Sequence, residues 1–212
     1  MAKSELRENL KPQQLDERNL DRDPIKQFRR WFEEANATKL PQAEAMALAT
    51  VSTDAKPSVR ILLLKHFDSE GFVFYTNYES QKGKELADNP TAAAVFYWPE
   101  LDRQVRIEGA VEKVSPEESD AYFRTRPRES QIGALASQQS EIIESRAALD
   151  RRFEELQRQY KGRPIPRPAY WGGYRLKPTR IEFWQARSAR LNDRILYELQ
   201  KGGSWSMKRL AP

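Results

Sequence analysis

The chain has 212 residues, 39% hydrophobic and 10% aromatic, and its 36 Lys and Arg against 31 Asp and Glu give a net charge of +5. The absence of cysteine excludes disulfides, thiolate catalysis and cysteine-ligated zinc, and the single histidine, His66, argues against both a His-rich metal site and a Ser-His triad. The modest excess of interspersed positive charge is typical of a solvated surface, also fits a pocket for phosphorylated small molecules, and is weak evidence for nucleic acid.

The N-terminal segment, residues 1–22, is polar and lacks helical or strand periodicity. This predicts a flexible arm ahead of a single domain over residues 23–212. No apolar segment of the signal-peptide type is present, and the longest aliphatic run, Ile61–Leu64, is too short to span a bilayer. We therefore expect a soluble cytoplasmic protein without a membrane partner.

The predicted helices begin at capping residues or follow an apolar stripe. Asp23 followed by Pro24 is typical of a helix start, and Ser115–Glu118 form a capping box. The first predicted helix runs from Pro24 to about residue 36, the second from its cap Ser80 through Ala87, and the third from Ser115 to a stop before Pro127. Ser130 can start a fourth helix. A fifth follows the apolar stripe Leu149–Tyr160 and ends at Gly162.

The hydrophobic pattern changes to a period of two from residue 45 onward. It predicts strands over 46–53, 58–67, 71–77, 91–98 and 103–114, and near 171–176, 180–185, 193–199 and 203–210. The apolar centre of the 58–67 strand indicates burial on both faces. With no βαβ alternation, Gly-x-Gly-x-x-Gly or Walker loop, the fold class is α+β, mainly an antiparallel β-barrel with peripheral helices.

One loop combines groups suited to a phosphate monoester. Arg126 and Arg128 flank the helix-breaking Pro127, and Ser130 offers a hydroxyl beside the start of the next helix. Guanidinium forks, a hydroxyl and free helical N–H groups are the donors that a phosphate prefers. The alternative interpretation is a charged loop with a capping serine.

Two further stretches carry candidate anion-binding cations. Arg60 and Lys65 bracket the apolar run of the 58–67 strand, where they either hold an anion at the barrel rim or reach out to water. Thr76, Lys82 and Lys84 lie where a strand gives way to a helix, a junction that can cradle phosphate. Lysines that follow a capping serine are also common on solvated helices.

Neutral polar groups and one tryptophan complete the candidate site. Gln104, Gln139 and Ser140 are donors and acceptors suited to the edge of an uncharged heteroaromatic ring, and Trp184 either covers such a ring or belongs to the core. No residue is an obvious nucleophile or general base. An enzyme of this composition would take its reactivity from a cofactor.

The segment "SARLNDRIL" alternates Arg190, Asn192 and Arg194. In an extended chain these three side chains point to one face. Two guanidiniums and an amide on one face indicate either half of an anion site or a solvated hairpin end.

Taken in order, the segments resemble the pyridoxine/pyridoxamine 5′-phosphate oxidase family over about residues 20–212. The most specific matches are "RILLLKHFD", "VFYTNYES", "RQVRIEG", "YFRTRPRESQIGA", "WGGYR", "IEFWQ", "RLNDR" and "RLAP". The resemblance implies an FMN-binding split β-barrel and a homodimer with FMN sites at the interface. It also implies oxidation of pyridoxamine and pyridoxine 5′-phosphate to pyridoxal 5′-phosphate, with O₂ reduced to H₂O₂. Neither a metal nor a nucleic-acid partner is expected.

The resemblance also implies which residues bind each ligand. The implied FMN contacts are Arg60, Ile61, Leu62, Leu63, Leu64, Lys65, Tyr75, Thr76, Gln81, Lys82, Gln104, Gln139, Ser140, Trp184 and Arg194. The implied substrate contacts are Arg7, Lys65, Tyr122, Arg126, Ser130, Arg190 and Asn192. Among them Arg190 and Asn192 stand at catalytic positions, and Arg7 belongs to the arm.

Three positions depart from the family's usual pattern. Asn192 replaces a histidine, and because an amide cannot take a proton near neutrality, a lost proton transfer would slow turnover by about 10²–10⁴. Leu10 lacks the hydroxyl of the usual tyrosine, and Gln81 replaces an arginine. These changes leave open a family member that binds FMN or pyridoxal phosphate with weak or no oxidase activity, as a carrier or sensor.

Overall fold

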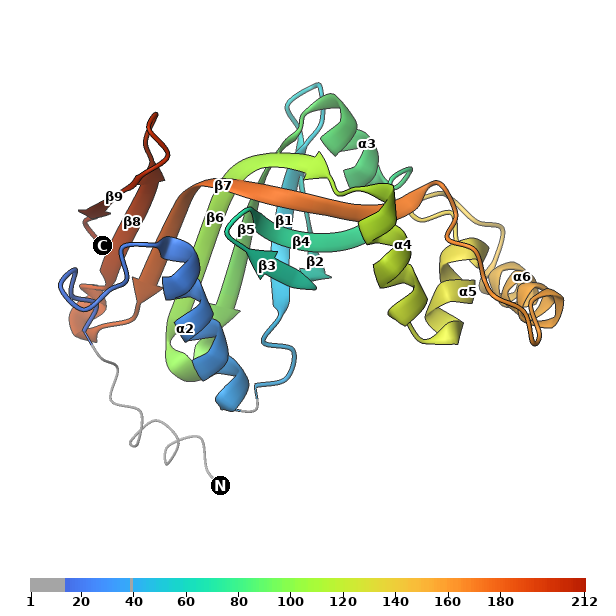
Figure 1. Ribbon diagram of the computed structural model, residues 1–212, viewed down its shortest axis with the longest axis horizontal. Coiled ribbons are helices and arrows are strands. Elements are labelled where there is room, and N and C mark those ends of the chain that lie inside the picture. The colour runs from blue at the N-terminus through green and yellow to red at the C-terminus, as the bar shows by residue number, and fades with distance from the viewer. Residues whose placement is uncertain (1–13, 39) are drawn as a thin grey trace.

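The computed structural model describes residues 14–38 and 40–212, in which nine strands form one antiparallel sheet (Figure 1). The strands are β1 (Ala45–Val51), β2 (Pro57–Leu63), β3 (His66–Asp68), β4 (Gly71–Asn77), β5 (Thr91–Trp98), β6 (Arg103–Lys113), β7 (Trp171–Gln185), β8 (Asp193–Leu199) and β9 (Trp205–Arg209). The helices are α2 (Pro24–Ala37), α3 (Gln81–Asp88), α4 (Pro116–Thr125), α5 (Arg128–Ala136) and α6 (Arg146–Gln159).

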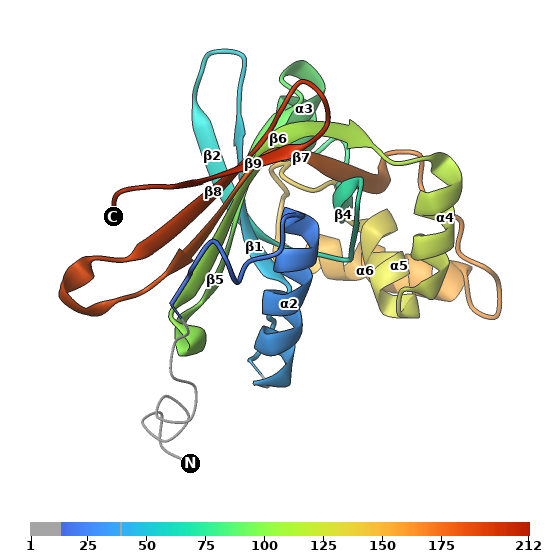
Figure 2. The ribbon, with the colours of Figure 1, turned by 60° about the vertical axis from the view of Figure 1, so that its left-hand side comes forward.

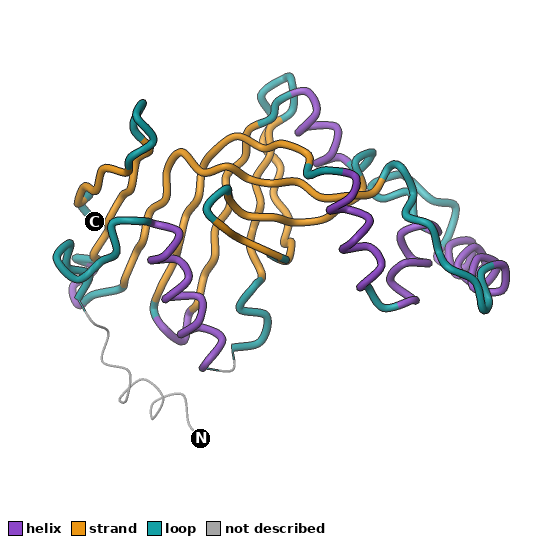
Figure 3. Tube along the Cα trace, in the orientation of Figure 1, coloured by secondary structure: helices purple, strands orange, loops and turns teal. Residues whose placement is uncertain are grey.

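The strands follow the order β2-β1-β5-β6-β7-β4-β3, and β8 pairs with β7 and β9. The sheet curves strongly, with the helices at its periphery (Figures 2 and 3). This arrangement confirms the predicted α+β class and the mainly antiparallel barrel. No helix in the described ranges has the length and apolar character needed to cross a membrane.

β7 connects β4 to β8 within the sheet, and its length differs from the prediction. The predicted strands at 171–176 and 180–185 are a single strand of 15 residues. Its first half pairs with β4 and its second half with β8, while β6 follows both across a bulge at Gly109. A Cβ at Gly109 would lie 2.0 Å from the Lys177 carbonyl oxygen, so the close backbone approach at this bulge requires glycine.

The predicted strand 58–67 is divided, and its predicted burial on both faces is wrong for the single chain. β2 ends at Leu63, and β3 begins at His66. β2 is an edge strand that pairs with β1, and nothing in the described chain packs on the face that carries Val59, 68% exposed, and Ile61, 66% exposed.

Helix starts confirm the capping predictions except at α5. The side chains of Asp23, Ser80 and Ser115 accept hydrogen bonds from the first turns of α2, α3 and α4. α5 begins directly after Pro127, which supplies no side-chain cap, so Ser130 lies in the first turn instead of starting the helix.

The apolar core has two parts. α2 covers the inner face of the sheet, where the Phe28 ring meets Phe72 at 4.9 Å and Phe96 at 5.1 Å between centroids. A second cluster, built around Phe123 and Ile132, holds α4, α5 and α6 together beside the start of β7. The sheet and the helical cluster therefore meet at β4, β7 and α4.

Residues 14–22, expected to belong to the arm, pack on the C-terminal strands. Leu15 is buried, and its carbonyl oxygen accepts a hydrogen bond from Arg209 at 2.6 Å. The Tyr197 hydroxyl donates to the Asp21 carbonyl at 2.8 Å. Two residues discussed above, Arg7 and Leu10, lie outside the described residues.

Candidate functional site

A cavity of about 690 Å³ opens where the sheet meets α4 and α5. Its lining includes many of the residues predicted to bind cofactor or substrate: Ile61, Leu62, Leu63, Lys65, Tyr75, Thr76, Tyr122, Arg126, Ser130 and Gln139. These residues come from segments spread over about 80 positions of sequence. The fold brings them together because β4 and α4 both pack against the start of β7.

Arg126 is a cation that forms no ion pair with any carboxylate of the described residues. α4 ends at Thr125 because Pro127 disfavours helical geometry at the preceding residue, and Arg126 is therefore extended. Its guanidinium carbon lies 4.5 Å from the centroid of the Trp171 ring. Among buried side-chain nitrogen and oxygen atoms of the described residues, only its NH1 atom has no hydrogen-bond partner. Burial lowers the pKa of Arg126, so the geometry favours an anion at this position.

Three stacked aromatic rings form one wall of the cavity. The Tyr75 ring lies 3.9 Å from Tyr122 and 5.5 Å from Trp171, centroid to centroid. Gly173 permits this packing, since a Cβ there would lie 2.8 Å from the Tyr75 ring. Burial raises the pKa of Tyr75 to about 12, so its hydroxyl stays protonated at neutral pH. Sequence reasoning assigned no role to Trp171, although the glycine pair that follows it signals a close approach.

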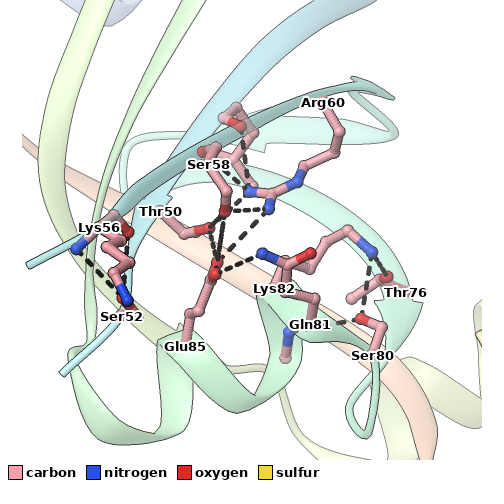
Figure 4. Close-up of polar contacts among 12 residues, drawn as sticks. Thr50, Ser52, Lys56, Ser58, Arg60, Thr76, Ser80, Gln81, Lys82 and Glu85 are labelled. Atoms are coloured by element: carbon pink, nitrogen blue, oxygen red, sulfur yellow. Dashed lines mark hydrogen bonds and ion pairs between the residues drawn. The ribbon is translucent and has the colours of Figure 1, made fainter. Parts of the chain in front are cut away.

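Lys82 is a buried cation, 5% exposed (Figure 4). Its ammonium donates to the Thr76 hydroxyl at 3.2 Å, the Ser80 hydroxyl at 3.1 Å and the Gln139 side-chain oxygen at 3.0 Å. All three acceptors are neutral. Burial, reinforced by the charge of Arg60, lowers the pKa of Lys82 to about 8.

Arg60 lies near Lys82 in a separate polar network centred on Glu85 (Figure 4). The Glu85 carboxylate accepts from Ser58 at 2.8 Å and from Gln81 at 2.9 Å, and it lies 3.4 Å from Arg60. Burial raises the pKa of Glu85, but hydrogen bonds from Thr50, Ser58 and Gln81 outweigh it and bring the pKa below its usual value. Sequence reasoning missed Glu85, although it stands one helical turn after Gln81.

Two cations of the predicted clusters point elsewhere. Lys84 forms an exposed ion pair with Glu141 at 2.9 Å. Arg128 donates to the carbonyl oxygens of Tyr160 and Arg163, at the end of α6. The other predicted anion-binding groups lie in two places: Arg126, Ser130 and Lys65 line the cavity, and Lys82 lies beside Thr76 with Arg60 nearby.

Gln104, Trp184 and Arg194 form a row across three neighbouring strands. Gln104 pairs with Trp184, and Trp184 pairs with Arg194, so the three side chains share the face opposite the core residues Val105 and Phe183. Trp184 is half-buried and outside both core clusters, so its core interpretation is wrong. Arg194 is held by the carboxylate of Glu182 at 2.7 and 3.1 Å.

Arg190 and Asn192 lie in the loop before β8, and the predicted extended alternation is wrong. Ser188–Arg190 form a 3₁₀ turn, with φ of 55° at Ala189 and 60° at Arg190. The Asn192 side-chain oxygen accepts from the Arg187 backbone N–H at 3.0 Å. Of the three alternating residues, only Arg194 belongs to a strand.

The cavity and the row lie apart in one chain. Gly172, opposite Thr76, and Trp184 are 12 residues apart on β7, and none of the row's three residues lines the cavity. Five further predicted FMN contacts also lie outside the cavity lining. Arg60, Gln81 and Lys82 belong to the polar networks beside Thr76 and Glu85, Leu64 is buried in the core, and Ser140 is exposed with φ of 75°. Within one chain, the predicted site residues therefore form two separate groups.

Two family models match this chain. One, described as pyridoxamine 5′-phosphate oxidase, matches residues 32–160. The chain belongs to the pyridoxamine 5′-phosphate oxidase family. The other, described as the pyridoxine 5′-phosphate oxidase C-terminal dimerisation region, matches residues 171–212. The match confirms the predicted resemblance, places the chain among the oxidoreductases and supports a homodimer. The dimerisation region contains Trp184, Arg190, Asn192 and Arg194.

Relatives in this oxidase family cover nearly the whole chain. A pyridoxine/pyridoxamine 5′-phosphate oxidase of Trichormus variabilis is 54% identical over 209 residues, covering 99% of this chain and 98% of the relative. One of Rubrobacter xylanophilus is 57% identical over 198 residues, covering 93% and 91%.

Solved structures confirm the split-barrel fold. PhzG of Burkholderia lata, in complex with tetrahydrophenazine-1-carboxylic acid, superposes with a TM-score of 0.87 at 33% identity, covering 92% of this chain and 95% of PhzG. A pyridoxamine 5′-phosphate oxidase-related, FMN-binding protein of Nostoc punctiforme gives 0.70 at 19% identity, covering 87% and 97%. The second likeness concerns the fold alone.

Proposed function

We propose that this chain oxidises pyridoxamine 5′-phosphate and pyridoxine 5′-phosphate to pyridoxal 5′-phosphate, with FMN as cofactor and O₂ reduced to H₂O₂. The observation that carries the proposal is the half-buried Arg126 guanidinium, whose buried NH1 atom has no hydrogen-bond partner among the described residues, in a cavity walled by aromatic rings. The substrate's phosphate would neutralise this cation, and the substrate's planar pyridine ring would fit against the aromatic wall.

The buried cation Lys82 supports an FMN phosphate. Its hydrogen-bond partners among the described residues are all neutral, and Arg60 lies nearby, so these two residues with Thr76 would hold the phosphate. Gln104 and Trp184 supply an amide and an indole suited to a flavin ring. FMN, when bound, supplies the two-electron acceptor that the protein's own side chains lack.

The substrate is held by its phosphate and oriented by the protein. Arg126, Ser130 and the Tyr122 hydroxyl would bind the phosphate, and because Arg126 packs on Trp171, this end of the substrate is fixed. Burial raises the pKa of Tyr122, so its hydroxyl remains a hydrogen-bond donor at neutral pH. We assign Arg190 to orienting the pyridine ring.

A homodimer would join the two groups of site residues. The outer face of the sheet exposes Val59, Ile61 and Tyr97, at 68%, 66% and 60%, around a shallow groove lined by Ala47 and Ala93. A second copy covering this apolar face would bring its Gln104–Trp184–Arg194 row to the cavity of the first. Each FMN site would then lie between subunits.

One sample tests the proposed function. The purified protein is expected to carry FMN, and to release one H₂O₂ for each pyridoxal 5′-phosphate formed from either substrate. A yellow protein that binds both ligands but releases no peroxide would contradict the oxidase and favour a carrier or sensor. Two residues are the reason for this alternative. Gln81 donates a hydrogen bond to Glu85, and the Asn192 amide cannot take up a proton near neutral pH.

FMN affinity is expected to fall as the pH rises above about 8. Below this pH, Lys82 of the FMN-free protein is protonated and attracts the phosphate, which is dianionic above its second pKa of about 6. Above about pH 8, Lys82 of the FMN-free protein is neutral. FMN binding must then be accompanied by protonation of Lys82, so the Kd for FMN rises by up to about tenfold per pH unit. Quenching of flavin fluorescence measures the Kd.

The matched control is Lys82→Arg, because a guanidinium stays charged over this range. This variant should show a flat profile, and so should wild-type protein with riboflavin, which has no phosphate. A wild-type Kd for FMN that does not change between about pH 7 and 9.5 would remove Lys82 from the phosphate site.

A further inference from the structure

The loop between β7 and β8 holds Arg190 in a conformation that is rare for residues with a Cβ. Ala189 and Arg190 are consecutive left-handed residues, with φ of 55° and 60°. Such residues persist only where their surroundings hold them, and glycine would adopt this geometry more readily. Something in the loop must therefore oppose its relaxation.

One side-chain hydrogen bond closes this loop. The Asn192 oxygen accepts from the Arg187 N–H at 3.0 Å, which ties the first and last residues of the turn together. The Leu191 N–H also donates to the Ser188 carbonyl at 3.2 Å, inside the same closure. Within the described residues, no other side chain hydrogen-bonds to the backbone of residues 187–192.

The closed loop is also anchored to the sheet. Asp193, the first residue of β8, lies 3.6 Å from the Arg187 side chain and 2.7 Å from Arg209 of β9. Between these fixed ends, the Arg190 side chain is exposed and forms no ion pair with the described carboxylates. The loop backbone therefore sets the direction of its Cα–Cβ bond.

We propose that Asn192 is a positioning residue that closes the 187–192 loop and directs Arg190 at the substrate, without contacting the substrate itself. The inference rests on the proposed function, which places Arg190 against the pyridine ring. It replaces the substrate-binding role expected of Asn192. It also gives a reason why an amide serves at this position: the closure needs a hydrogen-bond acceptor and no titrating proton.

The test compares Asn192→Leu, which has similar volume and no acceptor, with Asn192→Asp, which keeps the acceptor oxygen. Each Asn192 substitution is made in the wild-type chain and in the Arg190→Ala variant. Asn192→Leu is expected to lower kcat/KM for pyridoxamine 5′-phosphate about 10- to 100-fold when Arg190 is present, and to add nothing to Arg190→Ala. Asn192→Asp should stay within about threefold of the parent. FMN affinity should not change.

Hydrogen exchange at the Arg187 amide tests the closure without reference to activity. In the FMN-bound protein, Asn192→Leu should speed this exchange by about tenfold or more, whereas Asn192→Asp should not. Ser188→Ala, in the same loop, is the matched control and should alter neither exchange nor kcat/KM.

Two outcomes would overturn the inference: an unchanged Arg187 exchange rate in Asn192→Leu, or an equal loss of kcat/KM from Asn192→Leu when Arg190 is absent. The second would show that Asn192 acts on the substrate directly. A fully active Arg190→Ala would instead remove Arg190 from the substrate site. That result contradicts the proposed function, and the exchange measurement separates it from failure of the closure.

Discussion

Arg126→Met is expected to raise the KM for pyridoxamine 5′-phosphate by roughly 10²–10³-fold while FMN stays bound. The guanidinium packs over Trp171, and its buried NH1 atom has no hydrogen-bond partner among the described residues, so the substrate phosphate would be its counter-ion. Methionine keeps an unbranched apolar side chain against the ring but offers the phosphate neither charge nor donor. Steady-state peroxide release measures the effect.

Three comparisons make this result specific. Arg124→Met removes an exposed arginine two residues earlier on α4 and should leave the KM unchanged. Pyridoxamine without its phosphate should react equally slowly with wild type and Arg126→Met. Because burial disfavours the unpaired Arg126 cation, the substrate-free variant should melt no lower than wild type. A normal KM in Arg126→Met would show that the phosphate binds elsewhere.

Val59→Asp is expected to separate the dimer into monomers and to reduce both FMN binding and peroxide release by roughly 10²-fold or more at micromolar protein. Val59 is 68% exposed on β2, beside Ala49 of β1, in the open apolar face. In a two-fold dimer the substitution buries two unpaired carboxylates. Loss of the partner's Trp184 and Arg194 would leave each cavity without the FMN contacts of the row.

Sedimentation velocity reports the oligomeric state, and flavin absorbance reports the bound cofactor. The matched control is Ala87→Asp, which adds the same charge to an exposed position of α3. It should remain dimeric and yellow. A Val59→Asp protein that stays dimeric with full activity would show that the open face of β2 lies outside the interface.

Local chemistry, which can be read from the sequence by itself, determined most of the helices and strands of this fold. Asp23, Ser80 and Ser115 cap the helices predicted for them, because a cap satisfies N–H groups within three residues of itself. The period-two pattern indicated the strands and the antiparallel class, since alternation depends only on neighbouring side chains. The ordered motifs identified the family. The types of residue predicted a phosphate-bearing ligand and a cofactor that supplies the reactivity.

The tertiary structure decided which of these groups meet and what surrounds them. Sequence treated Arg126 and Arg128 alike, yet only Arg126 enters the cavity, because Trp171, 45 residues later, packs beneath it. The low pKa of Lys82 likewise comes from burial, which depends on segments far apart in sequence. The separation of Trp184 from the cavity follows from the length of β7. Spacing along a chain fixes local geometry, but long-range packing alone sets desolvation and the distances between residues far apart in sequence.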